Sequence, residues 1–229
     1  MVMKIKNLLI LVLVVLSGSF IYAQENLEVE MQRIKDIVGD DVKDSPIKRV
    51  LPRGEFTKAV KAGDVASIKR YLSDYYVNID ENDVEMSSWT PLLWAVDLGY
   101  KEIVEILIDN GADMKRRYPS GNTMLSRSIA FAYNGPEYSE IMKLLVRKSI
   151  EKNIDIINQR EDDATCMTPL MVAVTNNNED AVRFLLENNP DTKATSCKGK
   201  TDLDYALEIG NERIINLLRT YPPLPSPKK

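Results

Sequence analysis

The chain repeats a short helix-start pattern, a threonine followed two residues later by a leucine, at nearly regular intervals. The four copies start 33, 45 and 33 residues apart, at Thr90-Pro91-Leu92-Leu93, Thr123-Met124-Leu125-Ser126, Thr168-Pro169-Leu170-Met171 and Thr201-Asp202-Leu203-Asp204. A fixed period in this range is typical of stacked supersecondary units rather than of one globular core. Such arrays usually serve as binding surfaces.

Each copy predicts two short helices joined by a tight turn. Threonine caps a helix, and the proline that follows Thr90 has the φ angle of a first helical residue. Gly99 follows nine residues after Thr90, and apolar residues then recur at helical spacing from Val104. In the fourth unit Asn177 replaces this glycine, and we expect it to take the same left-handed turn. A copy without the threonine precedes the others at Ala59, Gly63, Ile68, Tyr71 and Leu72.

This pattern resembles the ankyrin repeat, most clearly from Thr90 to Gly99 and from Ile103 to Asp113. The resemblance covers residues 54–221 and implies an all-α ankyrin-repeat solenoid of about five helix-turn-helix units with short projecting hairpin loops. The units are expected near residues 54–86, 87–119, 120–164, 165–197 and 198–221. It also implies a concave face that binds partners.

Twelve core positions follow from the register of this pattern. They are Leu92, Ala95, Val104, Leu107, Leu170, Ala173, Val182, Leu185, Leu203, Ala206, Ile215 and Leu218. Trp94, which lies next to Ala95, is also expected in the core. These side chains should face neighbouring units, so truncating one should destabilise the array.

The sequence departs from the family in two respects. The family often has a histidine three residues after the threonine, which ties adjacent hairpins together, and this chain contains no histidine. Hydrogen bonds between its units must then be made differently or be weaker. The third unit is also 12 residues longer than 33, with four extra residues around 133–136 and eight within 147–159. We expect a longer turn and a lengthened second helix or exit loop, which either carries specificity or is a tolerated surface insertion.

Both ends of the chain differ from the repeats. Residues 1–23 have two lysines, an apolar stretch over 8–16 and a small-residue region ending at Ala23, which predicts a cleaved signal peptide. The alternative is a retained anchor helix, although nine apolar residues are few beside the roughly 20 that span a bilayer. Residues 24–53 are expected to form an N-terminal capping helix and linker. Residues 222–229 form a proline-rich tail, either solvated or a ligand for an SH3-type groove.

Charge and export limit the class of partner. Without residues 1–23 the chain has 28 basic and 34 acidic residues, a net charge of −6. Nothing in this composition attracts nucleic acid. We therefore expect a periplasmic or secreted monomer that binds a protein partner, with no membrane association after signal cleavage.

Cys166 and Cys197 are the two cysteines of the chain, and both fall in projecting loops of adjacent units. Neighbouring loops pair side by side, and an exported protein lies in a compartment where disulfides persist. We therefore expect a disulfide that closes a loop of about 30 residues. The alternative is two free thiols, because the two positions differ by two residues in register.

The residue inventory argues against catalysis and cofactors. Without histidine there is no imidazole base for a nucleophile, and neither cysteine has a zinc-ligand companion at short spacing. Adjacent acids occur at 40–41, 161–163 and 179–180, where solvated charge or helix capping is the usual role. The run Glu161-Asp162-Asp163 lacks the alternating spacing of calcium loops. We predict no enzyme activity, no metal site and no cofactor.

The resemblance assigns partner contacts to the loop tips and to the inner helix surface before each turn. These positions are Met86, Trp89, Asp97, Leu98, Arg117, Tyr118, Asp163, Thr175, Asn176 and Lys198. Aromatic and arginine side chains dominate interface energetics, which makes Trp89, Arg117 and Tyr118 the leading candidates. In the alternative interpretation Trp89 packs against its neighbouring loop and Arg117 belongs to a solvated charge pair. The expected function is that of an adaptor or protective factor, or of an inhibitor or immunity protein that neutralises a toxin or enzyme.

Overall fold

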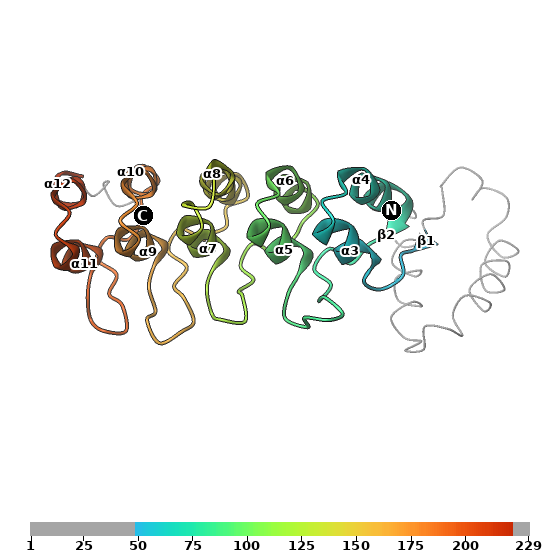
Figure 1. Cartoon of the computed structure of the whole chain (residues 1–229), viewed down its shortest axis with the longest axis horizontal. Coiled ribbons are helices and arrows are strands. Elements are labelled where there is room, and N and C mark those ends of the chain that lie inside the picture. The colour runs from blue at the N-terminus through green and yellow to red at the C-terminus, as the bar shows by residue number, and fades with distance from the viewer. Residues whose placement is uncertain (1–48, 222–229) are drawn as a thin grey trace, which may run out of the picture. The chain divides into compact units, whose positions relative to one another are not determined.

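A computed structural model describes residues 49–221, and in this part of the chain five helix pairs stack side by side in two rows (Figure 1). The inner row, from which the loops project, contains α3 (Glu55–Lys61), α5 (Pro91–Asp97), α7 (Met124–Ala130), α9 (Pro169–Thr175) and α11 (Asp202–Ile209). The outer row contains α4 (Val65–Asp74), α6 (Lys101–Asp109), α8 (Pro136–Glu151), α10 (Glu179–Glu187) and α12 (Glu212–Thr220). The predicted all-α solenoid of helix-turn-helix units is confirmed.

The recurring threonine starts each of the four later inner helices, as the sequence predicts. The hydroxyl oxygen of Thr90 accepts a hydrogen bond from the backbone N–H three residues later, and the hydroxyls of Thr123, Thr168 and Thr201 do the same. Each bond satisfies one of the free N–H groups at a helix start. At Thr201 the side chain of Asp204 also accepts from the backbone N–H of the threonine, which completes a capping box.

The turns between the paired helices use left-handed residues where the sequence predicts them. Gly63, Gly99 and Gly210 have positive φ angles, and Asn177 takes the same conformation with φ of 55°. Asparagine tolerates this region better than most side chains, which explains why it can replace glycine here.

The third unit absorbs its extra residues in the two expected places. The helix α8 has 16 residues, whereas α6, α10 and α12 have nine each. The turn before it runs from Phe131 to Gly135, and its Tyr133 side chain is 81% exposed. The prediction of a longer turn and a lengthened second helix is confirmed.

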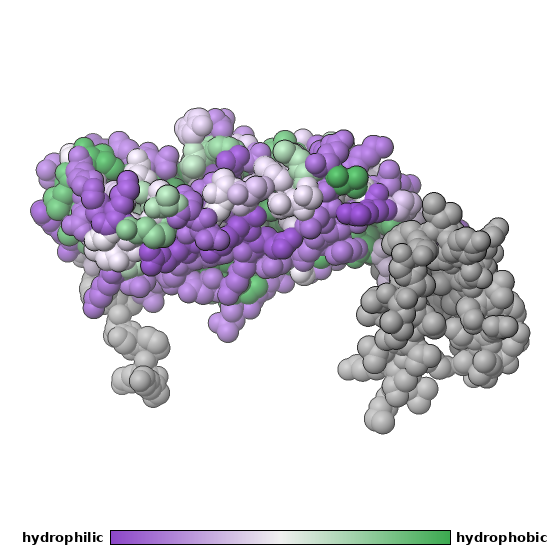
Figure 2. Space-filling view, turned by 90° about the horizontal axis from the view of Figure 1, so that it is seen from below, coloured by the Kyte–Doolittle hydropathy of each residue, from purple (hydrophilic) through white to green (hydrophobic). Residues whose placement is uncertain are grey.

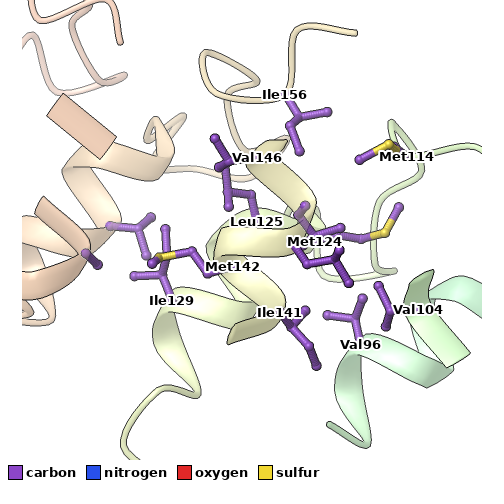
Figure 3. Close-up of a cluster of buried hydrophobic side chains, with 14 of the residues drawn as sticks. Val96, Val104, Met114, Met124, Leu125, Ile129, Ile141, Met142, Val146 and Ile156 are labelled. Atoms are coloured by element: carbon purple, nitrogen blue, oxygen red, sulfur yellow. The ribbon is translucent and has the colours of Figure 1, made fainter. Parts of the chain in front are cut away.

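The core lies between the two rows and between successive units. Figure 3 shows one section of it, where side chains of α7 and α8 meet Val96, Val104 and Met114 of the preceding unit. Ten of the twelve predicted core residues are buried. Leu203 and Leu218, at the last unit, are partly buried because no further unit covers them, and Trp94 is also partly buried.

Before the first helix pair the chain adds a short strand that the sequence did not predict. Residues Arg49–Val50 (β1), expected within a linker, pair in parallel with Tyr75–Tyr76 (β2) after α4. The backbone becomes extended at Tyr75, which leaves N–H and C=O groups free to pair.

Several expectations fall beyond the described residues: the signal peptide at 1–23, most of the capping segment at 24–53 and the tail at 222–229. Among residues 49–221, no helix combines the length and apolar content needed to cross a bilayer.

Candidate binding face

Four loops project from the inner row, and we call them fingers one to four: residues 77–90, 110–123, 152–168 and 188–201 (Figure 1). The finger face is the surface formed by these loops and by the exposed sides of the inner helices. Figure 2 looks onto the side from which the fingers project and shows a mainly hydrophilic surface with scattered apolar residues. Contacts on this face must therefore combine polar and apolar groups.

The fingers close in two alternating ways. In fingers two and four a tight turn joins positions four residues apart, from the N–H of Tyr118 to the carbonyl of Asn122 and from Ser196 to Lys200. Fingers one and three are wider. The N–H of Asp83 donates to the carbonyl of Trp89 at 2.7 Å, and that of Glu161 donates to Met167 at 2.8 Å. Asp83 and Glu161 therefore occupy equivalent positions, each seven residues before its capping threonine.

Hydrogen bonds between fingers replace the histidine that this chain lacks. A carboxylate oxygen of Asp80 accepts from the N–H of Asp113 at 3.0 Å, and the amide oxygen of Asn158 accepts from the N–H of Asp191 at 2.8 Å. Both links join residues 33 positions apart, one repeat along the chain. The N–H of Asp162 also donates to the carbonyl of Gly121 at 2.9 Å. Inter-unit hydrogen bonding is thus made differently from the family pattern.

Fingers three and four are linked covalently. The structure joins Cys166 and Cys197 in a disulfide, with their Cα atoms 5.2 Å apart. The N–H of Cys197 donates to the carbonyl of Thr165 at 2.9 Å, which holds the two loops in register. Cys166 has a φ of 52°, a left-handed conformation, and the bridge forms despite the two-residue offset in register.

An aromatic cluster fills the space at finger one. The Trp89 ring lies 4.3 Å from the Trp94 ring and 5.1 Å from the Tyr118 ring, measured between centroids. The indole N–H of Trp94 donates to a carboxylate oxygen of Asp83 at 3.0 Å, and Lys61 pairs with Asp83 at 3.4 Å. Lys61 also lies 4.9 Å from the centre of the Trp94 ring, within cation–π distance.

This cluster overturns the prediction that Tyr118 contacts a partner. The Tyr118 side chain is only 3% exposed, and its hydroxyl donates to the carbonyl of Leu93 at 3.0 Å. Burial raises the pKa of its phenol well above the ordinary value, and the nearby Asp97 adds to this effect. Trp89 is half-buried and packs on its neighbours, as in the alternative interpretation.

Arg117 is neither a free anchor nor a fully solvated charge. Its side chain is half-buried and donates to the carbonyl of Gly121 at 3.4 Å and to the carbonyl of Arg160 in finger three. Its guanidinium therefore links fingers two and three.

The next unit boundary holds a charge pair on the finger face. Arg127 of α7 contacts a carboxylate oxygen of Asp97, the last residue of α5, at 2.7 Å. The same guanidinium lies 4.1 Å from the centre of the Phe131 ring and 5.1 Å from the Tyr118 ring. Asp97, predicted as a partner contact, is thus engaged within the chain by a half-buried arginine.

Between units three and four the finger face opens into a cleft of about 240 Å³. We call this the unit-3/4 cleft. It is lined by Asn122, Ser126, Arg127, Ala130, Glu161, Thr165, Met167, Val172, Thr175 and Asn176. The carboxylate of Glu161, which is 8% exposed, accepts from Asn122 at 2.8 Å and from Thr165 at 3.4 Å. Burial raises its pKa, and the nearby Asp163 raises it further, while the bond from Asn122 opposes them.

The remaining predicted contacts are spread over the face. Met86 in finger one and Leu98 at the end of α5 are 46% and 37% exposed. Thr175 and Asn176, at the end of α9, border the unit-3/4 cleft, and Lys198 lies exposed at the turn of finger four. Asp163 has a local role instead, since its carboxylate accepts from the N–H groups at 165 and 166 and shapes the tip of finger three.

Of the residues that line the cleft, sequence reasoning predicts Thr175 and Asn176 as partner contacts and misses most of the others. In the sequence Glu161 stands out only as part of a run of acids, and no pattern marks Arg127 or Ala130 as functional. Comparing the residue seven positions before each threonine would have shown Asp83 and Glu161 as the two buried-acid candidates. Within residues 49–221 no group of three or more cysteine, aspartate or glutamate side chains is placed to hold a metal ion.

Comparisons with a family model and with known proteins both identify ankyrin repeats in this chain. A family model described as Ankyrin repeats (3 copies) matches residues 56–158 and 128–223, well over half of the chain. Similar proteins share the name Ankyrin repeat, SAM and basic leucine zipper domain-containing protein 1. The human protein is 26% identical over 131 residues, which cover 56% of this chain and 25% of the relative. The mouse protein is 37% identical over 71 residues, which cover 29% and 14%. The chain thus spans a quarter or less of the length of these relatives.

Proposed function

Because this chain belongs to the ankyrin-repeat family, we propose that it is an exported scaffold that binds another protein through its finger face. Members of this family are typically non-enzymatic and serve as protein-interaction scaffolds. The matched relatives extend well beyond the repeats, so their other domains carry no argument for this chain.

The observation that carries the proposal is the composition of the finger face. It combines exposed apolar side chains at Met86 and Leu98 with the mixed polar and apolar lining of the unit-3/4 cleft and the exposed Lys198. An apolar contact area beside polar groups is the usual composition of a protein-binding surface. The fingers that form it are held by hydrogen bonds and a disulfide, so little conformational entropy is lost on binding.

Export is supported by two independent features. Residues 1–23 have the charge and apolar pattern of a signal peptide. The disulfide between Cys166 and Cys197 fits a periplasmic or extracellular location, where such bonds persist.

The role of the complex is either that of an adaptor or protective factor, or that of an inhibitor or immunity protein. Both roles require the same binding face. They differ in the partner, because an inhibitor abolishes the activity of a toxin or enzyme that it binds. An activity assay on the captured partner separates the two.

The test is capture of a partner from the exported fraction of the source organism with the purified protein as bait. Met86→Asp and Leu98→Asp, each placing a charge on the finger face, are expected to reduce recovery of a specific partner at least about tenfold. Ile150→Asp is the matched control, since Ile150 is 58% exposed at the end of the outer helix α8. Equal recovery by all three variants contradicts binding through the finger face.

A further inference from the structure

The site of the unit-3/4 cleft has a counterpart in register at the first unit boundary, and the two boundaries differ in a way that suggests a ligand. Asp83 and Glu161 precede their capping threonines by seven residues, and their backbone N–H groups close equivalent hairpins. Lys61 is the last residue of α3, and Ala130 is the last residue of α7. The same register therefore places Lys61 opposite Asp83 and Ala130 opposite Glu161.

At the first boundary the buried carboxylate is fully engaged by the chain itself. Asp83 accepts from the indole N–H of Trp94 and from the N–H groups of Glu85 and Met86, and it pairs with Lys61. Burial alone would raise the pKa of Asp83, but these bonds and the lysine charge outweigh it and hold the pKa below its ordinary value. The lysine ammonium occupies the space beside the acid.

At the unit-3/4 boundary the counterparts of the two side-chain donors, Trp94 and Lys61, are missing. Ala130 stands where Lys61 does, and Val172, four residues after Thr168, stands where Trp94 does. Both residues line the cleft. Within residues 49–221 the side chains that donate to Glu161 are the uncharged Asn122, Thr165 and Ser126. Arg127 also lines the cleft, but its guanidinium forms an ion pair with Asp97.

A buried carboxylate without a cation is costly, and proteins usually pair such a charge. Ala130 and Val172 are smaller than Lys61 and Trp94, their counterparts in register, and the unit-3/4 cleft lies beside them next to Glu161. We propose that the unit-3/4 cleft receives a lysine or arginine side chain of the partner protein, with Glu161 as its counter-ion. This inference rests on the proposed function, since it names the chemistry that the finger face recognises.

A first experiment measures binding of single basic side chains by NMR on the isotopically labelled protein. The probes are the blocked peptides Gly-Gly-Lys-Gly-Gly and Gly-Gly-Arg-Gly-Gly at millimolar concentration, with Gly-Gly-Gln-Gly-Gly as the neutral control. We expect at least one basic peptide to shift the amide signals of residues lining the cleft, and the glutamine peptide to leave them unchanged. Glu161→Gln should weaken this binding at least about tenfold, because the charge is removed while the shape is kept.

A second experiment places a lysine of the chain itself in the cleft. Ala130→Lys restores the side chain that Lys61 supplies at the first boundary. It should raise the thermal midpoint, lower the measured pKa of Glu161 and block the basic peptides. Ala164→Lys is the control. Ala164 is exposed in finger three, which also carries Glu161, but it does not line the cleft. The same charge at this position should do none of these things.

The inference is overturned if neither basic peptide shifts the cleft signals, or if the shifts survive both Glu161→Gln and Ala130→Lys. It is also overturned if Ala130→Lys behaves like Ala164→Lys in stability and in the pKa of Glu161. Capture of a partner that is lost in Leu98→Asp but retained in Glu161→Gln would leave the proposed function standing and refute the cleft assignment alone.

Discussion

Asp202 is a buried acid at the start of α11, and it gives a prediction about stability with a defined sign and size. It occupies the position at which Pro91 and Pro169 begin α5 and α9. Burial raises its pKa from 3.8 to about 6, and the charges of Asp191 and Asp204 add to this, although backbone N–H groups at 202 and 203 oppose it. The charged form is therefore disfavoured in the folded state.

The sign of the pH dependence follows from this shift. Between about pH 4 and pH 6 the folded protein keeps a proton that the unfolded chain has lost, so stability falls as pH rises through this range. Each pH unit of difference in pKa corresponds to about 1.4 kcal/mol, so the charge costs at most about 3 kcal/mol above pH 7. Asp202→Asn should recover much of this cost near neutral pH and change little at pH 4.

The assay is urea unfolding of both proteins at several pH values between about 4 and 7.5. Asp204 provides the matched control two residues away, because hydrogen bonds from the N–H and hydroxyl of Thr201 hold its pKa below the ordinary value. Asp204→Asn should therefore destabilise the protein by nearly the same amount throughout this pH range, because the lowered pKa of Asp204 keeps its carboxylate charged there. A wild-type minus Asp202→Asn difference that is constant with pH would refute the reasoning.

Other predictions follow from single contacts. Leu107→Ala should cost about 2 to 5 kcal/mol in urea unfolding, since Leu107 is fully buried in α6, and an unchanged midpoint would contradict the stacked core. Replacing Cys166 and Cys197 with serine should cost about 3 to 4 kcal/mol on the chain-entropy model for a separation of 31 residues, and a thermal midpoint unaffected by the loss would speak against a native bridge. Tyr118→Phe should cost about 1 kcal/mol or more, because it leaves the carbonyl of Leu93 without its hydroxyl donor, and thermal unfolding of the two proteins measures this.

Much of the fold follows from local chemistry that is visible in the sequence. The capping threonines, the left-handed turns and the apolar spacing each depend on residues close together in the chain, and all three were predicted. The insertion in the third unit was also placed correctly. Ile141 and Leu144 align with Val104 and Leu107, so four extra residues must precede them and eight must follow.

The binding face was harder to predict because its residues lie about one repeat or more apart. Trp89 and Tyr118 are the aromatic side chains that interface statistics favour, yet their rings pack against each other between fingers one and two. The unit-3/4 cleft lies beside two small side chains, Ala130 and Val172. Such residues carry no functional group, so sequence patterns do not mark them as part of a site. Equivalent positions in all units must be compared to see that the expected cation is absent there.

The central claim is that the partner sits on the finger face, and site-specific photo-cross-linking tests it most directly. A benzophenone side chain would replace Leu98 or Thr175 on that face, and Lys143 or Arg183 on the outer helices α8 and α10, all of which are exposed. The account predicts a covalent product with the captured partner from positions 98 and 175 and none from 143 and 183. Cross-links formed from the outer helices but not from the finger face would contradict it.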